Sequence, residues 1–205
     1  MVLYSVVIVI CSTLITVANM LFNPLYQDKA WAYVLFTIGY VVAAILLDGI
    51  VAFAIRKMPE KWFTKDKGIF RTSERELRFY EFLKVKKWKD HIPELGCFTG
   101  FHKNKLLNPF DNKYIWRFII ESRYGVAIHI YSVPASFLLL LLDWRMYSGE
   151  SNIWLTIGLP VAIINAILIV LPAFILKYNL PRLLRIFDKN AAADAKKNQA
   201  NQQQY

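Results

Sequence analysis

Apolar residues are concentrated in four long runs, at about 2–22, 30–55, 125–142 and 153–176. Because roughly 20 helical residues cross a hydrocarbon core of about 30 Å, each run predicts a membrane-spanning helix. The first run has no Lys or Arg before it and no small-residue cleavage site, so we expect it to remain as an anchor. The pattern predicts an all-α protein with four transmembrane helices.

A polar insert, residues 56–124, separates the second and third spans, and its pattern predicts amphipathic helices on the cytoplasmic face or in the membrane interface. Ser73 and Glu76 form a capping box, which opens a predicted helix of about 74–87. The apolar arc of this helix is too broad for water. Pro93 predicts a turn after it. A second amphipathic helix begins near Asn112 and is expected to continue into the third span.

The chain is expected to form one integral membrane domain over residues 1–180. Residues 181–205 form a basic exit and a tail rich in Asn and Gln. This tail has few apolar residues to bury, so we expect it to be disordered.

The charge of the insert predicts the topology. Residues 56–123 contain 17 Lys and Arg against 9 Asp and Glu, and residues 177–205 contain 6 against 2. Short basic loops stay cytoplasmic, which predicts a multi-pass protein of the cell membrane with both termini in the cytoplasm. Attraction to anionic headgroups explains the net charge of +10. The chain lacks nucleic-acid-binding motifs, and we expect no nucleic-acid partner.

Ionisable residues inside the spans are candidates for chemistry, because each costs at least a few kcal/mol in lipid. Asp48 lies within the second span, where it either orients a base or a substrate hydroxyl, or forms a polar clasp to another span. His129 lies in the third span and is either a general base or a core histidine bonded to a carbonyl. Glu121 or Asp48 would orient its ring. The two cysteines have no metal-ligand spacing, and no metal site is expected.

Four stretches carry a family resemblance: "FYEFLKVKKWKDHIPELG", "GFHKNKL", "FIIESRYGVAIH" and "KYNLPRL". In this order and spacing they resemble the glycosyl-4,4′-diaponeurosporenoate acyltransferase family, membrane enzymes that acylate a sugar hydroxyl in staphyloxanthin-type carotenoid synthesis. The chain departs from the family pattern at Tyr124, Val126 and Leu180.

The resemblance implies transfer of a fatty acyl chain from a thioester to a hydroxyl of a glycosylated lipid or carotenoid. A ping-pong route through a serine or cysteine stays open, but no serine lies in an evident nucleophile setting, and we prefer direct transfer. His129, Glu121 and Asp48 are the candidate catalytic residues. The candidate substrate-binding residues are Trp88, Lys89, Asp90, Lys103, Arg123, Asn179 and Arg182. No cofactor is expected, and acyl-CoA or acyl carrier protein would be the donor.

The alternative is a non-catalytic protein that binds membrane lipid or serves as an assembly subunit. It explains the basic segments and amphipathic helices, but not an aspartate and a histidine within the spans. The sequence gives no oligomeric state.

Overall fold

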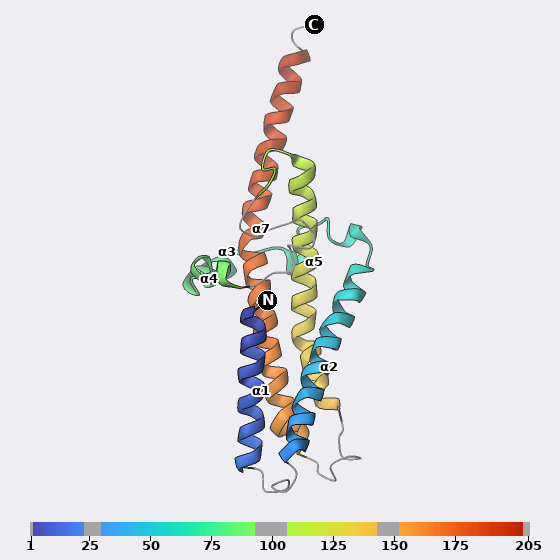
Figure 1. Ribbon diagram of the computed structural model, residues 1–205. Coiled ribbons are helices and arrows are strands. Elements are labelled where there is room, and N and C mark those ends of the chain that lie inside the picture. Colours follow the sequence, from blue (N-terminus) through green and yellow to red (C-terminus); the bar gives the residue numbers. More distant parts are fainter. Residues whose placement is uncertain (1, 23–29, 93–105, 143–151, 203–205) are drawn as a thin grey trace. The chain divides into compact units, whose positions relative to one another are not determined.

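The computed structural model describes residues 2–22, 30–92, 106–142 and 152–202, and these contain helices but no strand (Figure 1). The all-α prediction is confirmed. Within these ranges, four helical segments are long and apolar enough to cross a membrane. They are built on α1 (Val2–Phe22), α2 (Ala30–Arg56), α5 (Asn112–Ser136) and α7 (Leu159–Gln202).

Short helical turns extend two of the long helices. The 3-10 helix η6 (Phe137–Leu141) follows α5 directly, and the π-helix η7 (Trp154–Gly158) leads into α7. The prediction that the helix starting near Asn112 runs unbroken into the third span is confirmed.

The chain folds as two compact units. The first unit comprises Met1–Lys57 and Ile128–Leu171, and the second comprises Met58–Ala127 and Pro172–Tyr205. Both α5 and α7 contribute residues to each unit. The sequence predicts one domain over residues 1–180, a description at a coarser level than these units.

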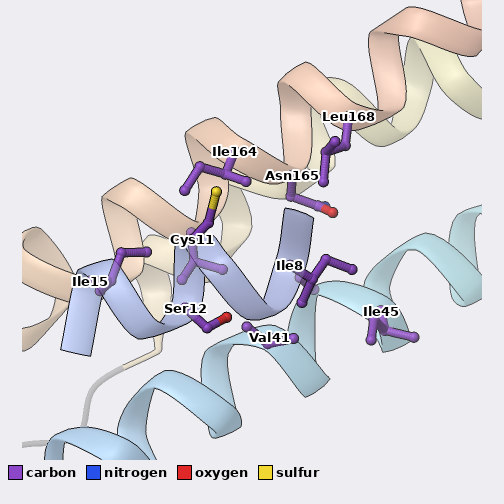
Figure 2. Close-up of a pocket in the computed structure, with 11 residues that line it drawn as sticks. Ile8, Cys11, Ser12, Ile15, Val41, Ile45, Ile164, Asn165 and Leu168 are labelled. Atoms are coloured by element: carbon purple, nitrogen blue, oxygen red, sulfur yellow. The ribbon is translucent and has the colours of Figure 1, made fainter. Parts of the chain in front are cut away.

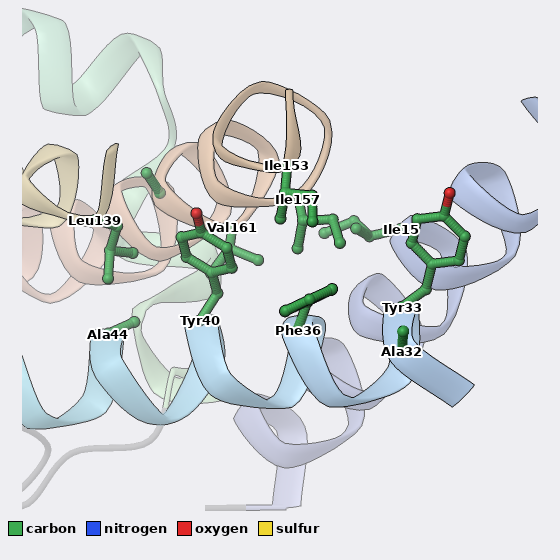
Figure 3. Packing of buried hydrophobic residues seen from close by; sticks show 11 residues of the cluster. Ile15, Ala32, Tyr33, Phe36, Tyr40, Ala44, Leu139, Ile153, Ile157 and Val161 are labelled. Carbon is green, nitrogen blue, oxygen red and sulfur yellow. The ribbon is translucent and has the colours of Figure 1, made fainter. Parts of the chain in front are cut away.

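An aromatic and aliphatic core holds the first unit together. Tyr33 and Tyr40 of α2 are fully buried, and Figure 3 shows them with Phe36 along one side of that helix, near Ile157 and Val161. Larger apolar side chains on the other faces remain exposed, among them Val9, Leu14, Leu46, Ile50 and Phe53. Such outward apolar surface fits a lipid solvent rather than water.

Polar side chains tie the spans of the first unit to one another. Thr16 of α1 donates to Thr37 of α2 over 3.1 Å. Asn19 of α1 donates to the carbonyl of Thr156 in η7 over 3.0 Å. Hydrogen bonds between polar side chains commonly link helices in lipid, where packing alone provides little hydrophobic drive.

The second unit contains the helices of the insert. The predicted capping box is confirmed: the backbone N–H of Glu76 donates to Ser73 Oγ, and the Ser73 N–H donates to the Glu76 carboxylate. The single helix predicted over about 74–87 is wrong, because α3 (Glu74–Phe82) and α4 (Val85–Trp88) are separate. Lys84 between them has φ 54° and ψ 39°, a left-handed conformation that ends a right-handed helix.

The sequence predicts a disordered tail, but in the structure the tail is helical up to Gln202. Residues 191–195 read "AAADA", and alanine has the highest helix propensity of all residues. The tail therefore continues α7, although residues 191–196 are exposed.

Candidate functional site

A polar network within the first unit contains Asp48, the carboxylate of the second span for which the sequence offers either a catalytic role or a clasp to another span. Asn165 of α7 donates from Nδ2 to Asp48 Oδ2 over 3.2 Å, and to Ser136 Oγ of α5 over 3.0 Å. The Ser136 hydroxyl donates to the carbonyl of Ser132 over 3.0 Å. Three spans thus contribute polar groups at one place. This geometry supports the clasp that the sequence offered for Asp48, and it leaves one carboxylate oxygen more weakly engaged, at 3.5 Å from the amide.

His129 lies on the same face of α5 as this network, since Ser132 and Ser136 follow it by three and seven residues. Its side chain is partly buried. Among the residues that the structure describes, none forms a hydrogen bond or ion pair with the imidazole. The helical spacing places the buried Ser132 of this network one turn from His129.

An apolar hollow of about 40 Å³ adjoins the network (Figure 2). Its lining includes Ile8 and Cys11 from α1, Val41 and Ile45 from α2, and Ile164 and Asn165 from α7. Asn165 therefore faces apolar side chains on one side and holds Asp48 on the other. Among the described residues, no other amide or charged side chain lines this hollow.

In the second unit, Arg123 of α5 binds the segment that follows the second span. Its Nη1 donates to the carbonyls of Phe63 and Thr64 over 3.0 and 2.8 Å, and its Nη2 pairs with Asp66 over 3.2 Å. The side chain is 1% exposed. The chain's own groups occupy the guanidinium, so the predicted contact between Arg123 and substrate stays a prediction.

Tyr124 reinforces the same attachment. The ring of Phe63 stacks on that of Tyr124 with centroids 3.9 Å apart, and the Tyr124 hydroxyl donates to the carbonyl of Met58 over 3.2 Å. The family departure at Tyr124 is therefore a packing residue in this chain.

Glu121, one of the two carboxylates expected to orient His129, belongs to the second unit. Arg117 Nη2 donates to Glu121 Oε1 over 2.7 Å, and Arg117 Nη1 pairs with Glu60 over 3.0 Å. The pairing of Glu121 with His129 stays a prediction.

Helix α3 is fixed to α7 by an ion pair and by aromatic packing. Lys177 Nζ lies 2.5 Å from Glu76 Oε1, and Thr72 donates to the Lys177 carbonyl over 2.9 Å. Burial alone would raise the pKa of Glu76, but hydrogen bonds from Lys177 and Ser73 outweigh it and the pKa is lowered. Tyr80 packs against Phe174, and burial, with the charge of Glu76, raises the pKa of Tyr80 to about 12.

The remaining predicted substrate-binding residues lie in the second unit or outside the described residues. Trp88 donates from Nε1 to the carbonyl of Leu83 over 2.9 Å. Lys89 is half-buried and Asp90 exposed, both in η4 (Lys89–His91). Lys103 and the predicted turn at Pro93 lie outside the described residues.

At the exit of the fourth span, Arg182 Nη2 donates to the Tyr178 hydroxyl over 2.7 Å, and the guanidinium lies 4.5 Å from the Tyr178 ring centroid. Asn179, the next residue, is half-buried. Across the described parts of the chain, no cluster of three or more His, Cys, Asp or Glu residues is positioned to hold a metal ion.

The model of the family described as glycosyl-4,4′-diaponeurosporenoate acyltransferase matches residues 59–189. The chain belongs to the glycosyl-4,4′-diaponeurosporenoate acyltransferase family. The predicted family is confirmed. No curated protein and no solved structure matches the chain.

Membership of the glycosyl-4,4′-diaponeurosporenoate acyltransferase family identifies a carotenoid acyltransferase at the level of the family, and the four apolar helices identify a membrane protein. The match begins after α2, so Asp48 lies outside it. His129, Asn165 and Arg182 lie inside it.

Sequence reasoning missed Asn165, Ser136 and Lys177 as structural partners. An amide within the apolar run "VAIINAILIV" was a usable signal for Asn165, because polar residues inside spans commonly bond across helices. Ser136 and Lys177 carry no such signal, because a serine inside a span and a lysine at its end are both ordinary there.

Proposed function

We propose that this protein transfers a fatty acyl chain from an acyl thioester to a hydroxyl of a glycosylated carotenoid or related glycolipid at the cytoplasmic membrane face. Family membership over residues 59–189 is the observation that carries the proposal.

In the proposed step, His129 accepts the proton of the acceptor hydroxyl while the hydroxyl oxygen attacks the thioester carbonyl carbon. A carbon–oxygen bond forms, the carbon–sulfur bond breaks, and the proton passes from the imidazolium to the departing thiolate. A cation, for which the sequence offers Lys89 or Arg182, stabilises the oxyanion. Transfer is direct, so no acyl-enzyme forms. General-base catalysis of this kind contributes on the order of 10²–10⁴-fold to the rate.

The proposal is tested with the full-length protein in lipid nanodiscs, supplied with acyl-CoA and a glycosylated carotenoid. Mass spectrometry of extracted lipid detects the gain of one acyl chain. We expect His129→Ala to lower the initial rate at least 100-fold. His91→Ala, which removes an exposed histidine of η4, should stay within about twofold of wild type.

Full activity of His129→Ala would exclude His129 as the base. A wild-type protein that binds the lipid but never acylates it would favour the non-catalytic alternative.

We also propose that both termini and the insert lie in the cytoplasm. The excess of Lys and Arg in residues 56–123 and 177–205 supports this orientation. A reporter fused after Ala192 should be active in the cytoplasm. Labelling of an Ala192→Cys variant by a membrane-impermeant thiol reagent in intact cells would contradict the topology.

A further inference from the structure

A hollow that combines lysines with aromatic rings lies in the second unit, close after the second span. We call it the basic hollow; it has a volume of about 480 Å³, and its lining is Lys61, Trp62, Thr64, Lys65, Lys67 and Phe70. Binding sites for small molecules commonly enclose about 300–1,000 Å³, so this volume suits a ligand of nucleotide size.

The charge of the basic hollow is not balanced by its acidic neighbours. Glu60 pairs with Arg117, and Asp66 pairs with Arg123. Lys61, Lys65 and Lys67 are exposed, and within the described ranges their ammonium groups have no ion-pair partner. Three cations around one hollow create a positive potential that attracts anions.

The backbone under the basic hollow is held in shape by α5. The buried guanidinium of Arg123 binds two carbonyls and one carboxylate of residues 63–66, and the Phe63 ring stacks on Tyr124. Phe63 also packs against Phe70 with centroids 5.6 Å apart. A ligand that enters this hollow therefore orders little additional chain, which lowers the cost of binding.

Aromatic rings in the lining narrow the class of ligand. Trp62 is 58% exposed and offers a flat face beside the lysines. Aromatic side chains stack on nucleobases, and lysines bind phosphates as point charges. A phospholipid headgroup contains phosphate but no flat ring, so it would use only the lysines.

We propose that the basic hollow binds the adenine nucleotide part of an acyl-CoA donor, with Lys61, Lys65 and Lys67 on its phosphates and Trp62 against the adenine. This inference rests on the proposed acyl transfer and names its donor. An acyl carrier protein, whose prosthetic group has no adenine, would not use Trp62 in this way.

The test uses the full-length protein in nanodiscs of zwitterionic lipid, titrated with adenosine 3′,5′-bisphosphate in a calorimeter. The triple variant Lys61→Gln, Lys65→Gln and Lys67→Gln should raise the Kd at least tenfold. Trp62→Leu should raise it about fivefold or more through lost stacking. The matched control is Arg75→Gln, Arg78→Gln and Lys189→Gln, three exposed cations of the same unit; it should stay within twofold.

Equal weakening in the control would reduce the effect to general charge and overturn the proposal. So would an absence of binding to wild type, or a Trp62→Leu variant that binds like wild type. Tighter retention of anionic lipid than of the bisphosphate, lost in the lysine variant, would assign the hollow to headgroups instead.

The test of the basic hollow can fail independently of the test of acyl transfer. Acyl transfer that depends on His129 without bisphosphate binding would refute only the basic hollow. Binding of bisphosphate without any acyl transfer would refute only the reaction. Because the lysines and Trp62 are exposed, these variants should fold, and gel filtration with far-UV circular dichroism verifies this.

Discussion

Glu76 of α3 and Lys177 of α7 form an ion pair although 101 positions separate them in the sequence. Lys177 is 8% exposed at its side chain and Glu76 is 38% exposed. The pair, together with the bond from Thr72 to the Lys177 carbonyl, fixes the first helix of the insert to the exit of the fourth span.

This pair predicts a pH dependence. The pKa of Glu76 is lowered from its ordinary value of 4.5, so the ionised carboxylate stabilises docked α3 above that pH. The stabilisation is lost as the pH falls through the lowered pKa. Hydrogen exchange of α3, corrected for intrinsic rates, should therefore accelerate in acid.

Glu76→Gln is the matched variant, because it keeps the shape and removes the charge. At pH 7 it should lower the protection of α3 by about 2–5-fold, as expected for a partly exposed ion pair. In Glu76→Gln, the protection of α3 should not fall further in acid through position 76, because glutamine does not titrate. Identical pH profiles for the two proteins would contradict the role of the pair.

Gly158 of η7 leaves no room for a side chain. A Cβ at this position would lie 2.8 Å from Cε1 of the fully buried Tyr40 ring. Gly158→Ala should therefore destabilise the protein by about 1–3 kcal/mol, the cost of overpacking. Gly49→Ala is the control, since nothing lies within 4 Å of its Cβ and alanine favours helix. Thermal unfolding in detergent measures both variants, and only Gly158→Ala should have a lower Tm than wild type.

Lys84 adopts a left-handed conformation between α3 and α4. Lys84→Gly should stabilise this junction by about 0.5–1 kcal/mol, because glycine adopts positive φ without steric cost. Lys86→Gly, which places glycine inside α4, should instead destabilise by about 1 kcal/mol. Hydrogen exchange over residues 79–92 measures both. Destabilisation by Lys84→Gly would show that the Lys84 side chain makes a contact that stabilises the protein more than the removal of backbone strain does.

The bond between Asn165 and Asp48 predicts energetic coupling between two spans. Asp48→Leu and Asn165→Leu, measured singly and together by denaturant unfolding in micelles, should couple by about 0.5–2 kcal/mol. The pair Asp48→Leu and Thr37→Val is the control, and its effects should add, because Thr37 bonds to Thr16 instead. Additive effects at Asp48 and Asn165 would mean that their bond contributes little.

Local features of this chain could be predicted, and distant contacts could not. The capping box at Ser73 was readable because both partners lie within four residues. The break at Lys84 could not be predicted, because a lysine in the sequence gives no signal for a positive φ. In the structure, the Lys84 N–H donates to the carbonyl of Glu81. The apolar runs predicted all four long helices, since span length depends only on local hydrophobicity.

The candidate site shows the same limit. Asp48 stood out as a charge in an apolar run, but its partner on α7 lies 117 positions away. The sequence offers Arg123 as a substrate contact and gives no sign of the partners that its guanidinium binds within the chain. Its partners in residues 63–66 lie about 60 positions upstream, and only the folded chain brings them to the guanidinium.

The closure of Arg123 on residues 63–66 affects how this protein should be cut and tagged. The connector after the second span reads as a dispensable tether, yet its first turns are bonded to a helix far along the chain. A tag or protease site placed between Met58 and Phe70 would separate those partners and damage the protein it was meant to report on. Engineering of this chain belongs in the exposed tail instead.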